Sequence, residues 1–170
     1  VVKQGASDFG NLTELTNVNG ALYFVAFNKL WKSDGTTDGT VLVDNATGTC
    51  QEVSTLASVG NTVYFSALRD DASGLTLWKS DGTVEGTVTV GDSASELWFV
   101  QSIISINDRL FFRGSDTQHG EQIWTSDGTT AGTIRVSAIA QPWASPDSLT
   151  NGDGTLFFTA NDGTHGRQLW

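Results

Sequence analysis

Several residue types that carry covalent or metal chemistry are scarce in this chain. Cys50 is the only cysteine, which excludes an intrachain disulfide and a metal site built from several cysteines. No apolar run is long enough to span a bilayer as a helix, so membrane insertion is not expected. Methionine is absent even from position 1, where Val1 stands, and this indicates a processed or partial chain.

Positive charge is also scarce. The chain has 9 Lys and Arg against 19 Asp and Glu, which gives a formal net charge of −10. An acidic surface repels phosphate backbones and anionic lipid, so nucleic acid and membrane surfaces are not expected partners. The same acidity attracts divalent cations.

A repeat dominates what is present. The segment Leu-Trp-Lys-Ser-Asp-Gly-Thr at 30–36 returns at 77–83, a close variant stands at 123–129, and a fourth copy begins at Leu169. Its tryptophans recur at intervals of 47, 46 and 46 residues: Trp31, Trp78, Trp124 and Trp170. A fixed period of this length is typical of an array of stacked supersecondary units.

Each repeat is predicted to form four short strands. An apolar residue opens the first strand, an aromatic triplet forms the second, the tryptophan lies in the third, and a β-branched segment after Ser-Asp-Gly-Thr-x-x-Gly-Thr forms the fourth. Turn-forming pairs such as Asn19-Gly20 separate the first two strands. Four-stranded antiparallel units at a period of about 46 residues are typical of β-propeller blades. The fold class predicted is therefore all-β, a β-propeller of about four blades.

The ends of the chain suggest how a ring would close. Val1 and Val2 stand in the register of a fourth strand without its blade, and the blade ending at Trp170 lacks its fourth strand. The N-terminal strand is thus predicted to complete the last blade, either in its own chain or in a neighbouring one. Residues 1–170 then form one propeller domain, half of an eight-bladed ring, or a four-repeat segment of a longer protein. A β-sandwich is a further alternative.

With these residues in place, the chain resembles the family of Glu-Leu-Trp-x-x-Asp-Gly-Thr-x-x-Gly-Thr repeats over nearly its whole length. Copies at 30–40, 77–87 and 123–133 match well, although the leading Glu is replaced in all of them. The resemblance implies a secreted or surface-anchored microbial protein with a propeller fold. It implies no activity, because propellers support many functions.

The repeated aspartates Asp34, Asp81 and Asp127 have two interpretations. Carboxylates beside hydroxyls and bent backbone are weak candidates for calcium ligands, and no other cofactor is expected. The alternative, which we favour, is that each aspartate stabilises the turn in which it lies. Each turn contributes a single repeated carboxylate, whereas calcium usually takes six to eight oxygens.

The remaining candidates are predicted to lie in loops on one face of a propeller. His119 and His165 fall in equivalent hairpins between second and third strands. They either share a metal or a proton or, as we favour, are surface members of one repeated loop. Trp98 and Trp143 lie in the connections that lead to the next repeat, where Phe9 has an equivalent place. Aromatic side chains there stack on sugar rings or fill space between blades.

Asn11 and Asn45 fit the pattern for N-glycosylation, which requires export. No catalytic motif occurs, so the leading hypothesis is a non-enzymatic extracellular propeller that serves structure or adhesion, alone or as one bead of a surface polymer or filament. Its partners would be copies of itself or neighbouring repeat domains. The alternatives are a lectin-like module that binds glycans or protein and, third, a glycosidase with paired carboxylates.

Overall fold

The computed structural model describes residues 9, 12–44, 50–68, 74–91, 97–139 and 144–170. Four separate antiparallel sheets occur there, and strands follow one another in chain order within each sheet. The first sheet contains β1 (Thr13–Val18), β2 (Ala21–Ala26), β3 (Lys29–Ser33) and β4 (Val41–Val43). The second contains β5 (Ser54–Val59), β6 (Thr62–Leu68), β7 (Leu75–Ser80) and β8 (Val88–Thr89).

The third sheet contains β9 (Trp98–Ile106), β10 (Arg109–Asp116), β11 (Gly120–Ser126) and β12 (Ile134–Arg135). The fourth contains β13 (Asp147–Gly152), β14 (Thr155–Asn161) and β15 (Arg167–Leu169). The predicted all-β repeat of antiparallel sheets is confirmed, and four separate sheets do not match a two-sheet sandwich. Among these residues no helix is long and apolar enough to cross a membrane.

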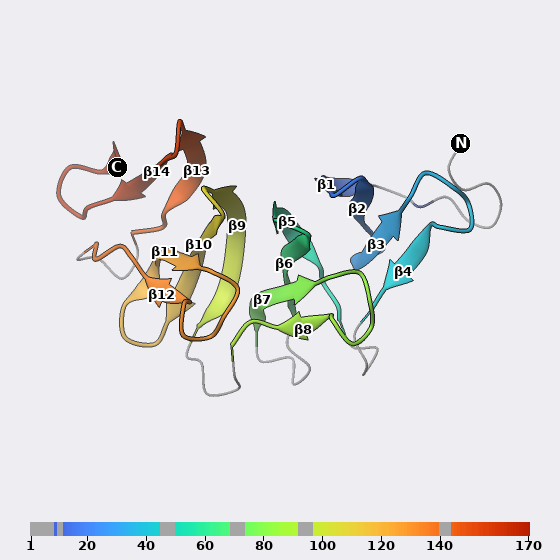
Figure 1. Ribbon diagram of the computed structural model, residues 1–170. Coiled ribbons are helices and arrows are strands. Elements are labelled where there is room, and N and C mark those ends of the chain that lie inside the picture. Colours follow the sequence, from blue (N-terminus) through green and yellow to red (C-terminus); the bar gives the residue numbers. More distant parts are fainter. Residues whose placement is uncertain (1–8, 10–11, 45–49, 69–73, 92–96, 140–143) are drawn as a thin grey trace.

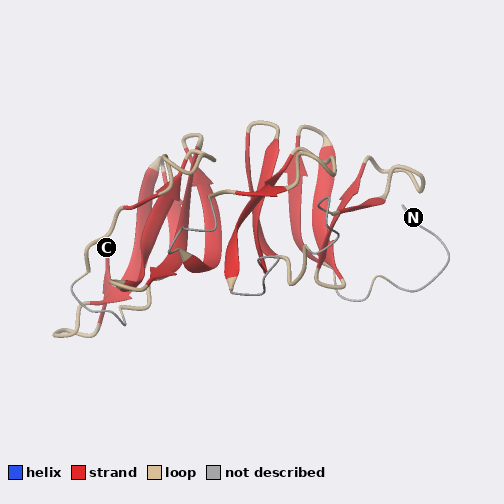
Figure 2. Ribbon diagram, turned by 90° about the horizontal axis from the view of Figure 1, so that it is seen from below, coloured by secondary structure: helices blue, strands red, loops and turns tan. Residues whose placement is uncertain are grey.

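The four sheets are arranged side by side in an open arc, with the first and fourth sheets at its two ends (Figure 1). The first strands of successive sheets contact one another along the inner side of the arc, β1 with β5, β5 with β9 and β9 with β13. In the view of Figure 2 the sheets lie side by side in a row along the length of the molecule. Val1 and Val2 lie outside the described residues, so completion of the fourth sheet by the N-terminal strand stays a prediction.

The sheets pack through two chemically different faces. The tryptophan face of a sheet carries the tryptophan of its third strand and the phenylalanine that lies across from it on the second strand. These pairs are Phe24 with Trp31, Phe65 with Trp78, Phe112 with Trp124, and Phe158 with Trp170. The opposite side, which we call the tyrosine face, carries Tyr23, Tyr64, Phe111 and Phe157 in the four sheets.

The core lies between sheets, where a tyrosine face meets the tryptophan face of the following sheet. One buried cluster joins Tyr23, Val25 and Leu30 of the first sheet to Phe65 and Trp78 of the second. A second cluster joins the tyrosine face of the second sheet to Leu110 and Phe112 of the third. The same order of faces is therefore used twice along the chain.

The predicted tight turns are present, and they use the backbone conformations that their residues favour. Asn19 and Gly20 have φ of 50° and 85°, and Asp153 and Gly154 have 53° and 86°. Two successive residues with positive φ are typical of the type I′ hairpin, which matches the twist of the flanking strands. The first two strands of these sheets are thereby joined with a fixed register.

Each first strand also contains an irregularity that the sequence did not predict. The residue before its apolar anchor has a positive φ, and these residues are Glu14, Thr55, Ser102 and Ser148. The register with the second strand shifts at the same places. A bulge of this kind bends a strand and increases its local twist. Repeated in all four inner strands, it shapes the inner side of the arc.

Candidate functional site

The repeated Ser-Asp-Gly-Thr turn is held by one network of hydrogen bonds, described here in the second sheet. Asp81 Oδ1 accepts hydrogen bonds from the backbone N–H of Thr83 at 2.9 Å and from its hydroxyl at 2.7 Å. Thr83 Oγ1 accepts a bond from the Gly86 N–H at 3.0 Å, and the Thr87 hydroxyl donates to the Thr83 carbonyl at 2.6 Å. The oxygens of Ser80 and Thr87 lie 2.7 Å apart.

The same bonds recur in the turns of the first and third sheets, around Asp34 and Asp127. All three carboxylates therefore serve the turn that contains them.

The second glycine of the motif leaves space for this carboxylate. A Cβ on Gly86 would lie 2.5 Å from Asp81 Oδ2 and still closer to its other carboxylate atoms. Gly39 and Gly132 have the same relation to Asp34 and Asp127. Any side chain at this position would push the aspartate away from its threonine, so the glycine is required for room.

The first sheet contacts this turn in the sheet that follows it. Lys32 Nζ donates a hydrogen bond to the Gly82 carbonyl oxygen at 3.2 Å. Tyr23 lies across from Lys32 in the register of β2 and β3, and its hydroxyl lies so close to Gly82 that a Cβ there would collide with it. A lysine and a tyrosine of one sheet thus enclose the turn glycine of the next.

The second sheet makes the same contact with the third. Lys79 Nζ donates to the Gly128 carbonyl oxygen at 2.9 Å, and the Tyr64 ring lies against Gly128. We call this arrangement the inter-sheet contact: Tyr23 and Lys32 on Gly82, and Tyr64 and Lys79 on Gly128. In the third sheet Phe111 and Thr125 stand at the two positions.

The electrostatics of the inter-sheet contact keep its partners in complementary states. Burial raises the pKa of Tyr23, and the negative charge of Asp81 raises it further. Hydrogen bonds from Thr83 hold the pKa of Asp81 below its usual 3.8, and the positive charge of Lys32 lowers it as well. The Asp81 turn therefore presents an anion beside a neutral phenol and a cation.

The calcium prediction remains a prediction. In the part of the chain that the structure describes, no three His, Cys, Asp or Glu side chains gather into a group suited to a metal ion. Asp34 and Asp127 have lowered pKa values, chiefly because Thr36 and Thr129 donate hydrogen bonds to them.

Both histidines lie in the hairpins where the sequence places them. Asp116 accepts hydrogen bonds from the backbone of Gln118 at 2.9 Å and of His119 at 2.5 Å, and its Oδ2 lies 2.9 Å from His119 Nδ1. The Gln122 amide donates to the His119 carbonyl oxygen at 3.2 Å and closes the hairpin. The Asp-x-x-His-Gly-x-Gln pattern thus builds a local turn.

The same turn occurs in the fourth sheet. Asp162 Oδ2 lies 2.8 Å from His165 Nδ1, and the Gln168 amide donates to the His165 carbonyl oxygen at 2.9 Å. The backbone hydrogen bond from His165, followed by its side chain, lowers the pKa of Asp162 to about 2. For Asp116, burial raises the pKa, but the hydrogen bonds from His119 outweigh it and the net change is downward.

The hairpins between second and third strands lie beside the connections between sheets, as expected for one loop face. Val53 N–H donates to the Asn28 carbonyl oxygen at 3.0 Å, and the Gln122 amide donates to the Ile139 carbonyl oxygen at 3.1 Å. Asn161 N–H donates to the Ala144 carbonyl oxygen at 2.9 Å. This loop face contains Trp98 and both histidine hairpins.

A depression of about 580 Å³ lies on this loop face beside the third sheet. Its lining includes Trp98, Phe99, Asp116, Gln118 and Glu121. Trp98 is 45% exposed and is the first residue of β9, whereas the sequence placed it in the preceding connection. An exposed indole beside carboxylate and amide groups is suited to stack on a ring and bond its hydroxyls.

The other aromatic candidate on the loops is placed elsewhere. Phe9 packs edge-on against Trp31, with ring centroids 5.0 Å apart, and against Phe24 at 5.8 Å. The structure therefore assigns Phe9 to the tryptophan face of the first sheet, in a sheet distinct from that of Trp98. Trp143, Asn11 and Asn45 lie outside the described residues.

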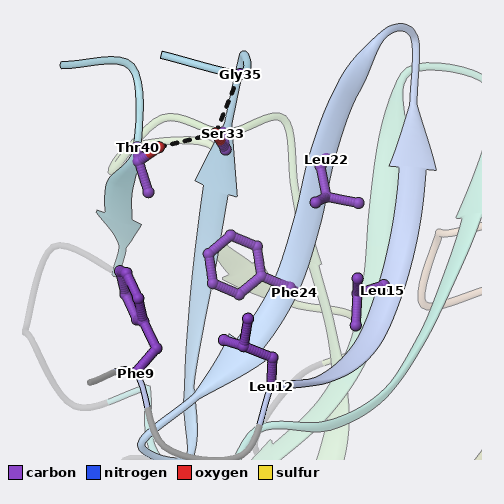
Figure 3. A pocket seen from close by; sticks show the side chains of 8 residues that line it. All are labelled: Phe9, Leu12, Leu15, Leu22, Phe24, Ser33, Gly35 and Thr40. Carbon is purple, nitrogen blue, oxygen red and sulfur yellow. Dashed lines mark hydrogen bonds between the residues drawn. The ribbon is translucent and has the colours of Figure 1, made fainter. Parts of the chain in front are cut away.

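A second depression, of about 290 Å³, lies on the tryptophan face of the first sheet. In Figure 3, Leu12, Leu15, Leu22, Phe24 and Phe9 surround it, and the turn residues Ser33, Gly35 and Thr40 form one end. The lining is almost wholly apolar. No sheet of the described residues covers this face.

Sequence reasoning missed the inter-sheet contact, although a signal for it was present. Tyr23 and Tyr64 are the only two tyrosines, and each falls in the same register position as a repeated lysine that follows the tryptophan. Tyrosine and lysine occur together in the first two repeats, where they enclose the turn of the next sheet. Both are replaced together in the third repeat, by Phe111 and Thr125.

The described residues thus define an all-β protein of repeated antiparallel sheets arranged in an arc. No protein-family model and no curated protein matches the chain. A solved structure, described as the crystal structure of puromycin hydrolase, is similar over 88% of this chain and 25% of its own, with a TM-score of 0.55 and 12% identity. The chain spans about a quarter of that protein, and at this identity the likeness shows the fold alone.

Proposed function

We propose that the chain is a non-enzymatic structural or adhesive module of the β-propeller type, acting outside the cell or at its surface. The observation that carries the proposal is the inter-sheet contact. The most strongly repeated polar residues hold turns and bind one sheet to the next. A chain whose repeated chemistry is used to join sheets is suited to building an extended or closed array.

Two further features support this proposal. The sheets follow one another with the same order of faces, as blades of a propeller do. The resemblance to secreted repeat proteins favours an extracellular location. Because Cys50 is the only cysteine, the chain has no intrachain disulfide, and packing between sheets must stabilise it there. In this role the module would be a ring, or one bead of a surface polymer or filament, with copies of itself or neighbouring repeats as partners.

The test is homotypic adhesion. Fluorescent beads carrying the folded chain through a terminal tag are mixed with bare beads of a second colour, and clusters are counted by microscopy. We expect clusters of coated beads that exclude bare ones and disperse when soluble chain is added in excess. Beads that stay dispersed at all coating densities would contradict an adhesive or assembling role. Beads carrying heat-unfolded chain serve as the control for nonspecific stickiness.

A second candidate function is carbohydrate binding on the loop face. The observation that favours it is the depression where exposed Trp98 stands beside Asp116, Gln118 and Glu121. Stacking of a sugar on an aromatic ring, with hydrogen bonds from carboxylate and amide groups, would suit this lining.

The corresponding experiment is a glycan array followed by titration of any ligand found. Trp98→Ala should abolish binding, because it removes the stacking surface. Trp170→Ala is the matched control, since Trp170 is also 45% exposed but lies in the fourth sheet. An empty array, or equal affinity of both variants for the ligand, refutes this candidate.

A further inference from the structure

The two ends of the arc expose positions whose counterparts are buried where the first sheet meets the second and the second meets the third. Leu15 and Leu22, on the tryptophan face of the first sheet, are 61% and 36% exposed. Their counterparts in the second sheet, Leu56 and Val63, are buried against the first sheet. Phe9 covers Phe24 on this face, so the exposed surface, which we call the head of the arc, consists of Leu12, Leu15 and Leu22.

The other end shows the complementary half. Leu169 and Phe157 lie on the tyrosine face of the fourth sheet and are 72% and 40% exposed. The counterparts of Leu169 in the other three sheets are buried, and they are Leu30, Leu77 and Ile123. We call Phe157 and Leu169 the tail of the arc. Neighbouring exposed apolar side chains are typical of surfaces that contact another protein.

We propose that the head of one copy binds the tail of a second copy, and that this contact repeats the packing already present between successive sheets. The inference rests on the proposed structural role and specifies its geometry. At two junctions inside the arc, a tyrosine face receives the tryptophan face of the sheet that follows it. The tail is a tyrosine face and the head is a tryptophan face, so joining them continues the same series.

The turn glycine of the first sheet is uncovered, whereas its counterparts in the second and third sheets are covered by the sheet before them. Gly82 and Gly128 are covered by the tyrosine and lysine of the preceding sheet. Gly35 holds the equivalent place in the first sheet, and a Cβ there would meet nothing within 4 Å. Phe157 of the second copy, which stands in the register position of Tyr23 and Tyr64, would lie against it.

A head that binds a tail makes a heterologous interface, which closes into a ring or continues as an open array. Two surface substitutions separate this geometry from others. Leu15→Glu disables the head and keeps the tail, whereas Leu169→Glu disables the tail and keeps the head. Both sites are exposed in the single copy, so the fold should be retained, which circular dichroism and thermal unfolding would verify.

The experiment is sedimentation velocity of the 170-residue chain over a hundredfold range of concentration. Wild type should form either a closed ring of several copies or an open array that grows beyond a dimer as concentration rises. Each variant alone should associate at least about tenfold more weakly, because an unpaired carboxylate would be buried at its only contact. An equimolar mixture should form a 1:1 dimer and nothing larger, since one good head then meets one good tail. Val84→Glu, a half-exposed turn residue at neither end, is the control and should assemble as wild type does.

Three outcomes overturn the proposal. A wild-type chain that is monomeric at every concentration shows that head and tail do not join copies. Dimers of Leu169→Glu alone show a head-to-head contact instead, and unchanged assembly of both variants places the contact elsewhere. Clustering of coated beads together with either of the last two results leaves the structural role standing while the head-to-tail geometry fails.

Discussion

Substitution of Gly86 by alanine tests whether the repeated aspartate and the second glycine of the motif act as a unit. The new Cβ would lie 2.5 Å from Asp81 Oδ2, where ordinary van der Waals contacts begin at 3.4 Å. Either the backbone of the turn shifts or Asp81 rotates away from Thr83 and loses two hydrogen bonds. Overpacking of this kind costs about 1–3 kcal/mol.

For a chain of this length, 1 kcal/mol lowers the melting temperature by about 2–4 °C, so Gly86→Ala should lower it by roughly 2–12 °C. The measurement is thermal and urea unfolding followed by tryptophan fluorescence. The informative step is a double-mutant cycle with Asp81→Ala. Once the carboxylate is gone, the Cβ of residue 86 has room, and the cost of Gly86→Ala should nearly disappear.

An equal cost of Gly86→Ala with and without the Asp81 carboxylate would refute the steric role of the glycine. That result would mean that the glycine is needed for backbone freedom and not for space. The first and third sheets provide internal repetitions of the experiment, because Gly39 and Gly132 stand in the same relation to Asp34 and Asp127.

Two further predictions concern the core and acid stability. Trp78→Ala should lower the free energy of unfolding in urea by about 3–5 kcal/mol, because Trp78 is buried between the first two sheets. Trp170→Ala should lower it by only about 1–2 kcal/mol, because its ring is half exposed. Equal losses for the two variants would contradict a core that lies between the sheets. The stability of the fold should fall on acidification. Aspartates whose pKa is lowered in the folded chain, including Asp162 at about 2, stabilise the fold at pH values above 3.8, their pKa in the unfolded chain. That contribution is lost as the pH falls toward 2. Unfolding midpoints measured between pH 5 and 2 check this, and Asp162→Asn should flatten the profile; a wild-type midpoint constant down to pH 2 would refute it.

Strand order and turn type could be predicted from the sequence because they are local. Period-two alternation around Tyr23-Phe24 and the Asn19-Gly20 pair determine a hairpin without reference to the rest of the chain. The turn role of Asp81 followed from Asp-Gly chemistry, and its hydrogen bonds have the expected form. The repeat then extended each local conclusion to the other sheets.

What lies between sheets could not be predicted in the same way. The bond from Lys32 to Gly82 joins residues 50 positions apart, and its existence depends on how two sheets are rotated against each other. Ser102 has a positive φ although serine gives no local reason for it, so the bulge in β9 was not visible either. Trp98 was placed in a connection because β9 is longer than the first strands of other repeats.

The second sheet carries both halves of the inter-sheet contact, since it offers Tyr64 and Lys79 on one side and receives Lys32 at Gly82 on the other. A gene segment encoding such a sheet can be duplicated in tandem, and the new junction is built from residues that already fit. Loss of the segment would restore a junction of the same type. Array length can therefore change during evolution by recombination between repeats, without new compensating substitutions at the point where sheets meet.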